Sequence, residues 1–102
     1  MKKFVARNSR GQKCFCKYEI TETGLLSVVF FVPIYRFSIY WPLKRDLIRI
    51  NGVRDTLDGR KTMIRFLIHP AAWMGKSFNH PRNSSIIECI EGAFECFINL
   101  YE

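Results

Sequence analysis

The chain has 102 residues, of which 48% are hydrophobic and 15% aromatic, and its formal net charge is +7. This length suits one domain, and the apolar content excludes an intrinsically disordered chain, because burial can offset the entropy lost on ordering. We expect the chain to fold alone or as a small homo-oligomer.

The charge is unevenly placed along the chain. Residues 1–82 hold all 16 Lys and Arg residues and five acids, whereas residues 83–102 hold four acids and no Lys or Arg. A cationic body with an acidic tail favours an anionic partner, which could be nucleic acid, an anionic membrane surface or an acidic protein face.

No segment predicts export or membrane spanning. The first 13 residues are basic but lack the apolar run of a secretory signal. The longest apolar run, residues 25–35, is about half the ~20 residues that a membrane-spanning helix needs. We therefore expect a cytoplasmic protein whose thiols stay reduced.

The first predicted strand covers residues 13–21. Its alternation places Cys14 and Cys16 on one face and Phe15 and Lys17 on the other, which is typical of a half-buried strand. Residues 25–32 follow after a turn and are almost unbroken in their hydrophobicity. This second pattern predicts a strand that is buried on both faces or holds a central position in the sheet.

Alternation resumes at residues 36–41 and again in two segments around Asp58-Gly59. An Asp-Gly pair between alternating segments predicts a two-residue hairpin turn. We place the two strands of this hairpin at residues 47–57 and 60–68, and a strand-rich region at residues 13–79 as a whole.

A C-terminal helix is predicted at residues 85–101. Ser85 and Glu88 have the spacing of a capping box, and apolar residues recur behind them at steps of three and four. We expect the apolar stripe to pack across the sheet. The alternative is a partner or self-association surface, for which the positions to examine are Cys89, Phe94 and Ile98.

Six or seven strands followed by one amphipathic helix is the element order of pleckstrin-homology-like domains. Residues 24–27, 35–43 and 46–50 resemble the strand rhythm of the small bacterial members, although here Trp41 precedes Pro42 instead of following it. The resemblance covers most of the chain from residue 13 onward. It implies a mainly β (α+β) fold, an antiparallel barrel or sandwich of six to seven strands with one C-terminal helix.

The resemblance also implies a binding or scaffold module that is not an enzyme. The lipid-binding members share a cluster of Lys and Arg across their first hairpin. The best-defined early turn here, residues 21–24, lacks that cluster, so a phosphoinositide is not the expected ligand.

Neither a catalytic site nor a metal site is predicted, and no cofactor is expected. His69 and His80 lack a Ser, Cys or carboxylate at a recognisable catalytic spacing. Zinc bound by four thiolates is the alternative to ordinary burial of the cysteines, but their spacing does not match a zinc knuckle. The four cysteines are Cys14, Cys16, Cys89 and Cys96.

The basic residues give the main functional hypothesis. They are interleaved with Tyr35, Tyr40 and Trp41, a combination that could bind single-stranded nucleic acid by phosphate contact and stacking. Solvent-facing strand positions also commonly hold Lys and Arg, however, and we expect these aromatics to belong to the core.

We therefore predict a binding or scaffold module that recognises a protein partner or an anionic surface through a basic rim, and a small nucleic-acid-binding protein as the alternative. The predicted rim consists of Lys44, Arg45, Arg54, Arg60 and Lys61.

Overall fold

A computed structural model describes residues 1–33, 36–41, 48–55, 61–71 and 86–101, with residues 51–55 described by their backbone alone. Within these ranges the chain forms seven strands and one helix. The elements are β1 (Lys2–Arg7), β2 (Lys13–Ile20), β3 (Leu26–Pro33), β4 (Phe37–Ile39), β5 (Ile48–Asp55), β6 (Lys61–Ile68), α1 (Ile86–Phe97) and β7 (Ile98–Leu100).

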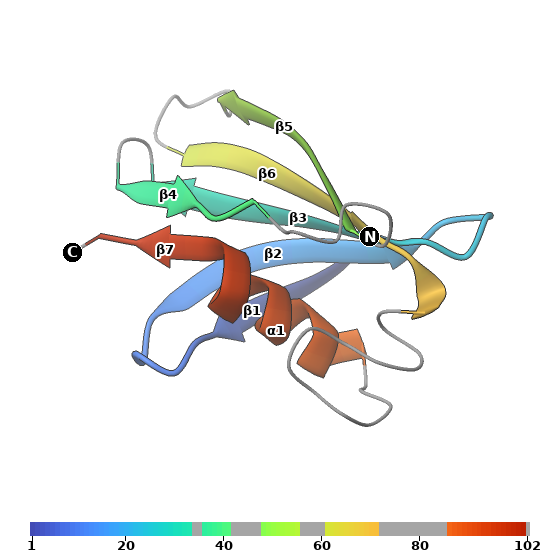
Figure 1. Cartoon of the computed structure of the whole chain (residues 1–102), viewed down its shortest axis with the longest axis horizontal. Helices are drawn as coiled ribbons and strands as arrows, with labels where there is room; N and C mark the ends of the chain where they lie inside the picture. The colour runs from blue at the N-terminus through green and yellow to red at the C-terminus, as the bar shows by residue number, and fades with distance from the viewer. Residues whose placement is uncertain (34–35, 42–47, 56–60, 72–85, 102) are drawn as a thin grey trace.

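The strands form two antiparallel sheets (Figure 1). Five of them lie in the order β1-β2-β3-β6-β5, and β4 pairs with β7 in a short ribbon. The ribbon and α1 lie on one side of the large sheet, which gives a sandwich-like body. The predicted mainly β fold with one C-terminal helix is confirmed.

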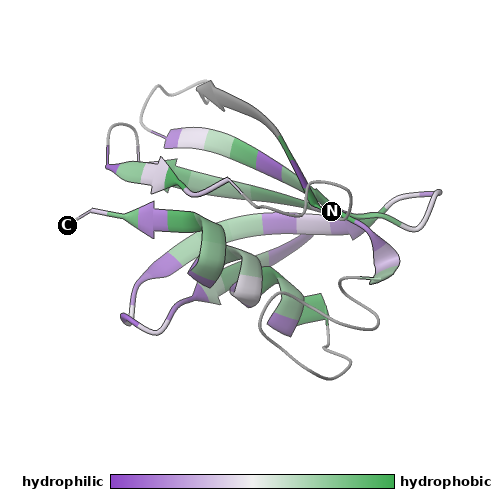
Figure 2. Cartoon of the chain, viewed as in Figure 1, coloured by the Kyte–Doolittle hydropathy of each residue, from purple (hydrophilic) through white to green (hydrophobic). Residues whose placement is uncertain are grey.

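β3 occupies the centre of the large sheet, between β2 and β6. Its residues facing α1 are fully buried, and Val29 on the other face is only 6% exposed. The predicted central position is confirmed, while on the face away from α1 the burial extends to Val29 and Phe31 is half-buried. In β6, by contrast, every second residue is buried, and Figure 2 shows hydrophilic bands between its hydrophobic stretches.

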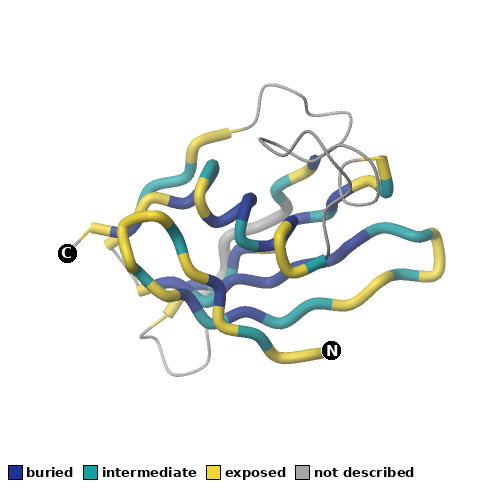
Figure 3. The backbone as a smooth tube through the Cα atoms, turned by 90° about the horizontal axis from the view of Figure 1, so that it is seen from below, coloured by how far each residue is buried: buried dark blue, intermediate teal, exposed yellow. Residues whose placement is uncertain are grey.

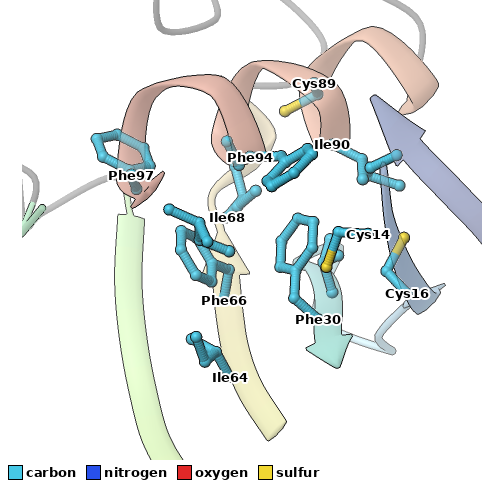
Figure 4. Close-up of a cluster of buried hydrophobic side chains, with 14 of the residues drawn as sticks. Cys14, Cys16, Phe30, Ile64, Phe66, Ile68, Cys89, Ile90, Phe94 and Phe97 are labelled. Atoms are coloured by element: carbon cyan, nitrogen blue, oxygen red, sulfur yellow. The ribbon is translucent and has the colours of Figure 1, made fainter. Parts of the chain in front are cut away.

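The core lies between the large sheet and α1. Phe30 on β3 is in contact with Phe66 on β6 and with Phe94 on α1, at ring-centroid distances of 5.4 and 6.2 Å (Figure 4). The ring centroids of Phe66 and Phe97 are 5.9 Å apart. Figure 3 shows that buried residues lie where α1 crosses the strands and exposed ones at the connecting turns. The apolar stripe of the helix is therefore used for core packing.

The helix is shorter than predicted. It ends at Phe97, and Ile98–Leu100 form β7 instead of a last helical turn. Ile98 and Leu100 are buried while Asn99 is exposed, so this segment also fits the two-residue period of a strand. Pairing with β4 provides main-chain partners that a sequence pattern cannot reveal.

Besides β7, the strand β1 was not predicted. β1 precedes the region 13–79 and pairs with β2 along its full length. Only Phe4 and Ala6 face the core in this strand, which gives too short an apolar pattern for a sequence-based assignment. The first hairpin is therefore β1–β2, and the turn at residues 21–24 joins β2 to β3.

The second predicted hairpin is confirmed in its strands. β5 and β6 pair antiparallel, with a bulge between Asn51 and Val53. The Asp58-Gly59 turn and the predicted cap Ser85 lie outside the described residues. Among the residues that are described, no helix has both the length and the hydropathy needed to cross a bilayer.

Candidate functional site

The large sheet has two chemically different faces. Side chains alternate along each strand, so every second residue joins the core under α1 and the others point to the opposite side. On β2, Cys14 and Cys16 belong to the core (Figure 4), whereas Phe15 and Lys17 point away from α1. We call this opposite side the open face.

An apolar row crosses the open face from β1 to β6. Val5 on β1 lies opposite Phe15 on β2. Phe15 lies opposite Phe31 on β3, which in turn lies opposite Met63 on β6. The rings of Phe15 and Phe31 are half-buried, with centroids 5.5 Å apart and planes tilted by 37°. This apolar row consists of Val5, Phe15, Phe31 and Met63.

Cationic side chains lie on both sides of the apolar row, each two residues further along its strand. Residues two apart on a strand are separated by about 7 Å on the same face. Five of these six cations are exposed, and Lys17 is half-buried. The first cationic row consists of Lys3, Lys17 and Arg65, with the β3 residue Val29 between Lys17 and Arg65, and the second consists of Arg7, Lys13 and Lys61, with the β3 residue Pro33 opposite Lys61.

The cations and the aromatic rings interact directly. The Nζ atom of Lys17 lies 5.8 Å from the centroid of the Phe31 ring, within the range of a cation–π interaction. None of the positions that make up the three rows carries an acid, while Glu19 lies one step beyond the first row, opposite Ser27. The three rows together form a cationic strip with an apolar centre.

One of the five predicted rim residues belongs to the open face. Lys61 is exposed at the start of β6 and lies in the second cationic row. Arg54 lies on β5 opposite Met63, but only its backbone is described. Lys44, Arg45 and Arg60 lie outside the described residues, so the predicted rim is not assembled by the part of the chain that the structure describes.

The sequence contained a signal for the residues that the rim prediction missed. The alternation in β2 already places Lys13, Phe15 and Lys17 on the face opposite the cysteines. Their neighbours in space, Phe31 and Arg65, come from β3 and β6, and only the strand register brings them together.

The β4–β7 ribbon presents a second exposed surface. Tyr40, Trp41 and Tyr101 are 69%, 53% and 53% exposed, respectively. The expectation that Tyr40 and Trp41 belong to the core is therefore wrong; Tyr35 lies outside the described residues. The ribbon instead contributes Phe37 and Ile39 to the packing around the core.

Hydrogen bonds hold the ribbon surface in place. The Tyr101 hydroxyl donates to the Ser38 hydroxyl at 2.8 Å, and the Tyr101 N–H donates to the Arg36 carbonyl at 2.8 Å. The Arg10 guanidinium in the β1–β2 turn donates to the Asn99 side-chain oxygen at 2.9 Å. The exposed aromatic rings thus stand on a strand pair with a fixed position.

The acidic residues of α1 bind the β1–β2 hairpin. The Arg7 N–H donates to the Glu91 carboxylate at 2.9 Å, and both the N–H and the hydroxyl of Ser9 donate to the Glu95 carboxylate. The bonds from Ser9 lower the pKa of Glu95 below its ordinary value. These contacts border a groove of about 310 Å³ between helix and hairpin. Glu91 and Glu95 therefore serve the fold.

The cysteines behave as core residues. Cys14, Cys16 and Cys89 are buried and Cys96 is half-buried. Burial raises the pKa of each of the three buried thiols to about 12. In the described ranges, no group of three or more His, Cys, Asp or Glu residues could hold a metal ion. Ordinary burial explains these thiols.

We expect the three buried thiols to resist alkylation in the folded protein. Their pKa of about 12 keeps them protonated at pH 8, and the thiolate is the reactive form. Because the unfolded thiols ionise near pH 9.0, their contribution to stability is complete below that pH and is lost as the pH rises towards 12. Iodoacetamide labelling at pH 8, read by mass spectrometry with and without urea, checks the expected resistance to alkylation. Rapid labelling of all four cysteines in the native protein would contradict it.

Comparisons with protein-family models, with curated proteins and with solved structures found no match to this chain.

Proposed function

We propose that this chain is a non-enzymatic binding module that takes an anionic partner on the open face of its large sheet. The observation that carries this proposal is the arrangement of six cations in two rows on either side of the apolar row. Such a strip concentrates positive potential on one surface and leaves apolar area beside it for contact.

The fold keeps this surface separate from the residues that stabilise the protein. The acids of the helix lie on the other side of the sheet, where two of them bind the β1–β2 hairpin. The core aromatics likewise face α1. Substitutions on the open face can therefore alter the contacts with a partner without removing the main packing interactions of the core.

A pleckstrin-homology-like identity remains part of the proposal. It is supported by the sequence of strands followed by a helix that packs on the sheet. The first hairpin of the structure, β1–β2, carries Lys3, Arg7, Lys13 and Lys17 on the open face, so the turn at residues 21–24 is not the right place to judge anionic-lipid binding. Anionic vesicles therefore belong among the probes.

The test compares two triple variants with the same loss of charge. The open-face variant is Lys3→Gln, Lys17→Gln and Arg65→Gln. The control variant is Lys2→Gln, Arg10→Gln and Arg36→Gln, which removes three exposed cations from other surfaces. A cation near an anionic surface contributes about 1 kcal/mol, so we expect about a 100-fold loss of affinity for heparin in the first variant.

The control variant should lose much less affinity, and both variants should keep the native circular dichroism spectrum. An equal loss in the two variants would show that only net charge matters, which would remove the open face as the site.

The ribbon surface favours a protein contact as a second candidate function. Tyr, Trp and Arg dominate the binding energy of protein interfaces; Arg36 and Tyr101 lie at one end of this ribbon, and Tyr40 and the exposed Trp41 follow its other end. If the partner is a second copy, sedimentation velocity should show a mass above the monomer that Trp41→Ala reduces. A monomer at all concentrations would exclude self-association through the ribbon.

A further inference from the structure

We infer that the anionic partner is single-stranded nucleic acid, which runs across the strands of the open face with its bases on the apolar row. This inference rests on the proposed function and specifies its ligand. It is drawn from three features of the open face: the aromatic pair, the depth of the apolar row and the direction of the rows.

The aromatic pair provides a stacking platform. Phe15 and Phe31 are neighbours on adjacent strands with half-buried rings, and the Lys17 Nζ atom lies over the Phe31 ring, so a base would stack on the exposed part of Phe15 and share the Phe31 ring with Lys17. Every base has a π-face that can stack on such a ring, and replacing one stacking ring typically weakens binding by about 5- to 150-fold. In a duplex, the neighbouring base pairs already cover these base surfaces.

The aromatic part of the apolar row is less exposed than most of the cations around it. Phe15, Phe31 and Met63 are half-buried and Val5 is 45% exposed, whereas five of the six flanking cations are exposed and Lys17 is half-buried. A flat bilayer would meet the long cationic side chains first and would reach the rings poorly. A single strand can place its phosphates beside the cations and turn its bases down onto the rings.

The direction of the rows defines the path of the strand. The apolar row and both cationic rows run perpendicular to the β-strands, from β1 to β6. Three strand spacings of about 4.8 Å give a path of about 14 Å. At about 3.4 Å per nucleotide of a stacked strand, this path holds about four nucleotides, which is the lower end of the 4–16 nucleotides that single-stranded binding folds cover.

The salt dependence of binding follows from the number of phosphates in contact. For single strands, the logarithm of the affinity falls with the logarithm of the salt concentration by about 0.7 for each phosphate neutralised. Three cations of one row predict a slope of about −2, and six cations of both rows predict about −4. We expect a slope between these values.

The probe is a fluorescein-labelled single-stranded oligothymidine of 12 nucleotides, titrated by fluorescence anisotropy. The variant is Phe15→Leu with Phe31→Leu, which keeps apolar volume but removes the rings. The matched control is Ile20→Leu with Ile87→Leu, which changes two exposed apolar side chains outside the open face. We expect the first variant to lose at least tenfold in affinity for the oligonucleotide with an unchanged salt slope, and the control to bind as the unmodified chain does.

Further probes separate failure of this inference from failure of the proposed function. Heparin and vesicles of phosphatidylserine with phosphatidylcholine contain no bases, so their binding should not change in the Phe15→Leu, Phe31→Leu variant. If these probes bind and the oligonucleotide does not, the inference is wrong and the proposed function stands. If none of the probes binds, both are wrong. A duplex of equal length that binds as tightly as the single strand would also overturn the inference.

Discussion

Replacing Phe30 by alanine is expected to lower the free energy of unfolding by about 3–5 kcal/mol. The Phe30 side chain is fully buried at the centre of the large sheet and connects β3 to β6 and to α1 through Phe66 and Phe94. Its removal leaves a cavity between sheet and helix that neighbouring rings cannot fill without moving. Because domains of this size have a total stability of about 5–15 kcal/mol, the variant should be close to unfolding.

Urea denaturation followed by circular dichroism measures this effect. Phe15→Ala provides a control with the same chemical change on the neighbouring strand, where the ring is half-buried on the open face. We expect its cost to be less than half that of Phe30→Ala. Equal costs for the two substitutions would contradict a core that lies only between the sheet and α1.

Deleting residues 98–102 is expected to cost about 3–6 kcal/mol. The deletion removes β7, whose Ile98 and Leu100 are buried, and burial of each such side chain contributes about 1.5–3 kcal/mol. It also removes the partner strand of β4 and the Leu100 carbonyl, which accepts a hydrogen bond from Gln12 at 3.0 Å. Urea denaturation of the shortened chain, compared with the full chain, measures the loss.

A shorter deletion distinguishes the contribution of β7 to stability from that of the last two residues. Removing residues 101–102 leaves β7 intact and breaks the two hydrogen bonds that the structure describes for Tyr101. We expect this change to cost about 1–2 kcal/mol. If the longer deletion cost no more than the shorter one, Ile98 and Leu100 would not belong to the core.

The stability variants and the binding variants lie on opposite faces of the same strands. Cys16 and Lys17 are consecutive, yet one packs in the core and the other in the first cationic row. This separation follows from the two-residue period of a strand. It makes the binding experiments interpretable, because substitutions on the open face leave the core intact.

The sequence predicted the elements whose local pattern and tertiary environment agree. β2, β3 and β6 were recognised because alternation or continuous hydrophobicity matches their burial. The helix was recognised for the same reason, because its apolar stripe matches the burial of the described residues Ile86–Phe97. At the end of the helix, Ile98 and Leu100 satisfy both a helical and a strand period, so only their pairing with β4 decides between the two.

The candidate site depended much more on the tertiary structure. The sequence by itself determined that the chain is a β-rich, cationic domain and that Lys13, Phe15 and Lys17 share one face of a strand. It could not determine that Phe31 lies beside Phe15, or that Arg65 lies in the same row as Lys17, because these neighbours are set by strand order and register. Register depends on how the whole sheet closes over α1, and that contact joins residues far apart in the chain.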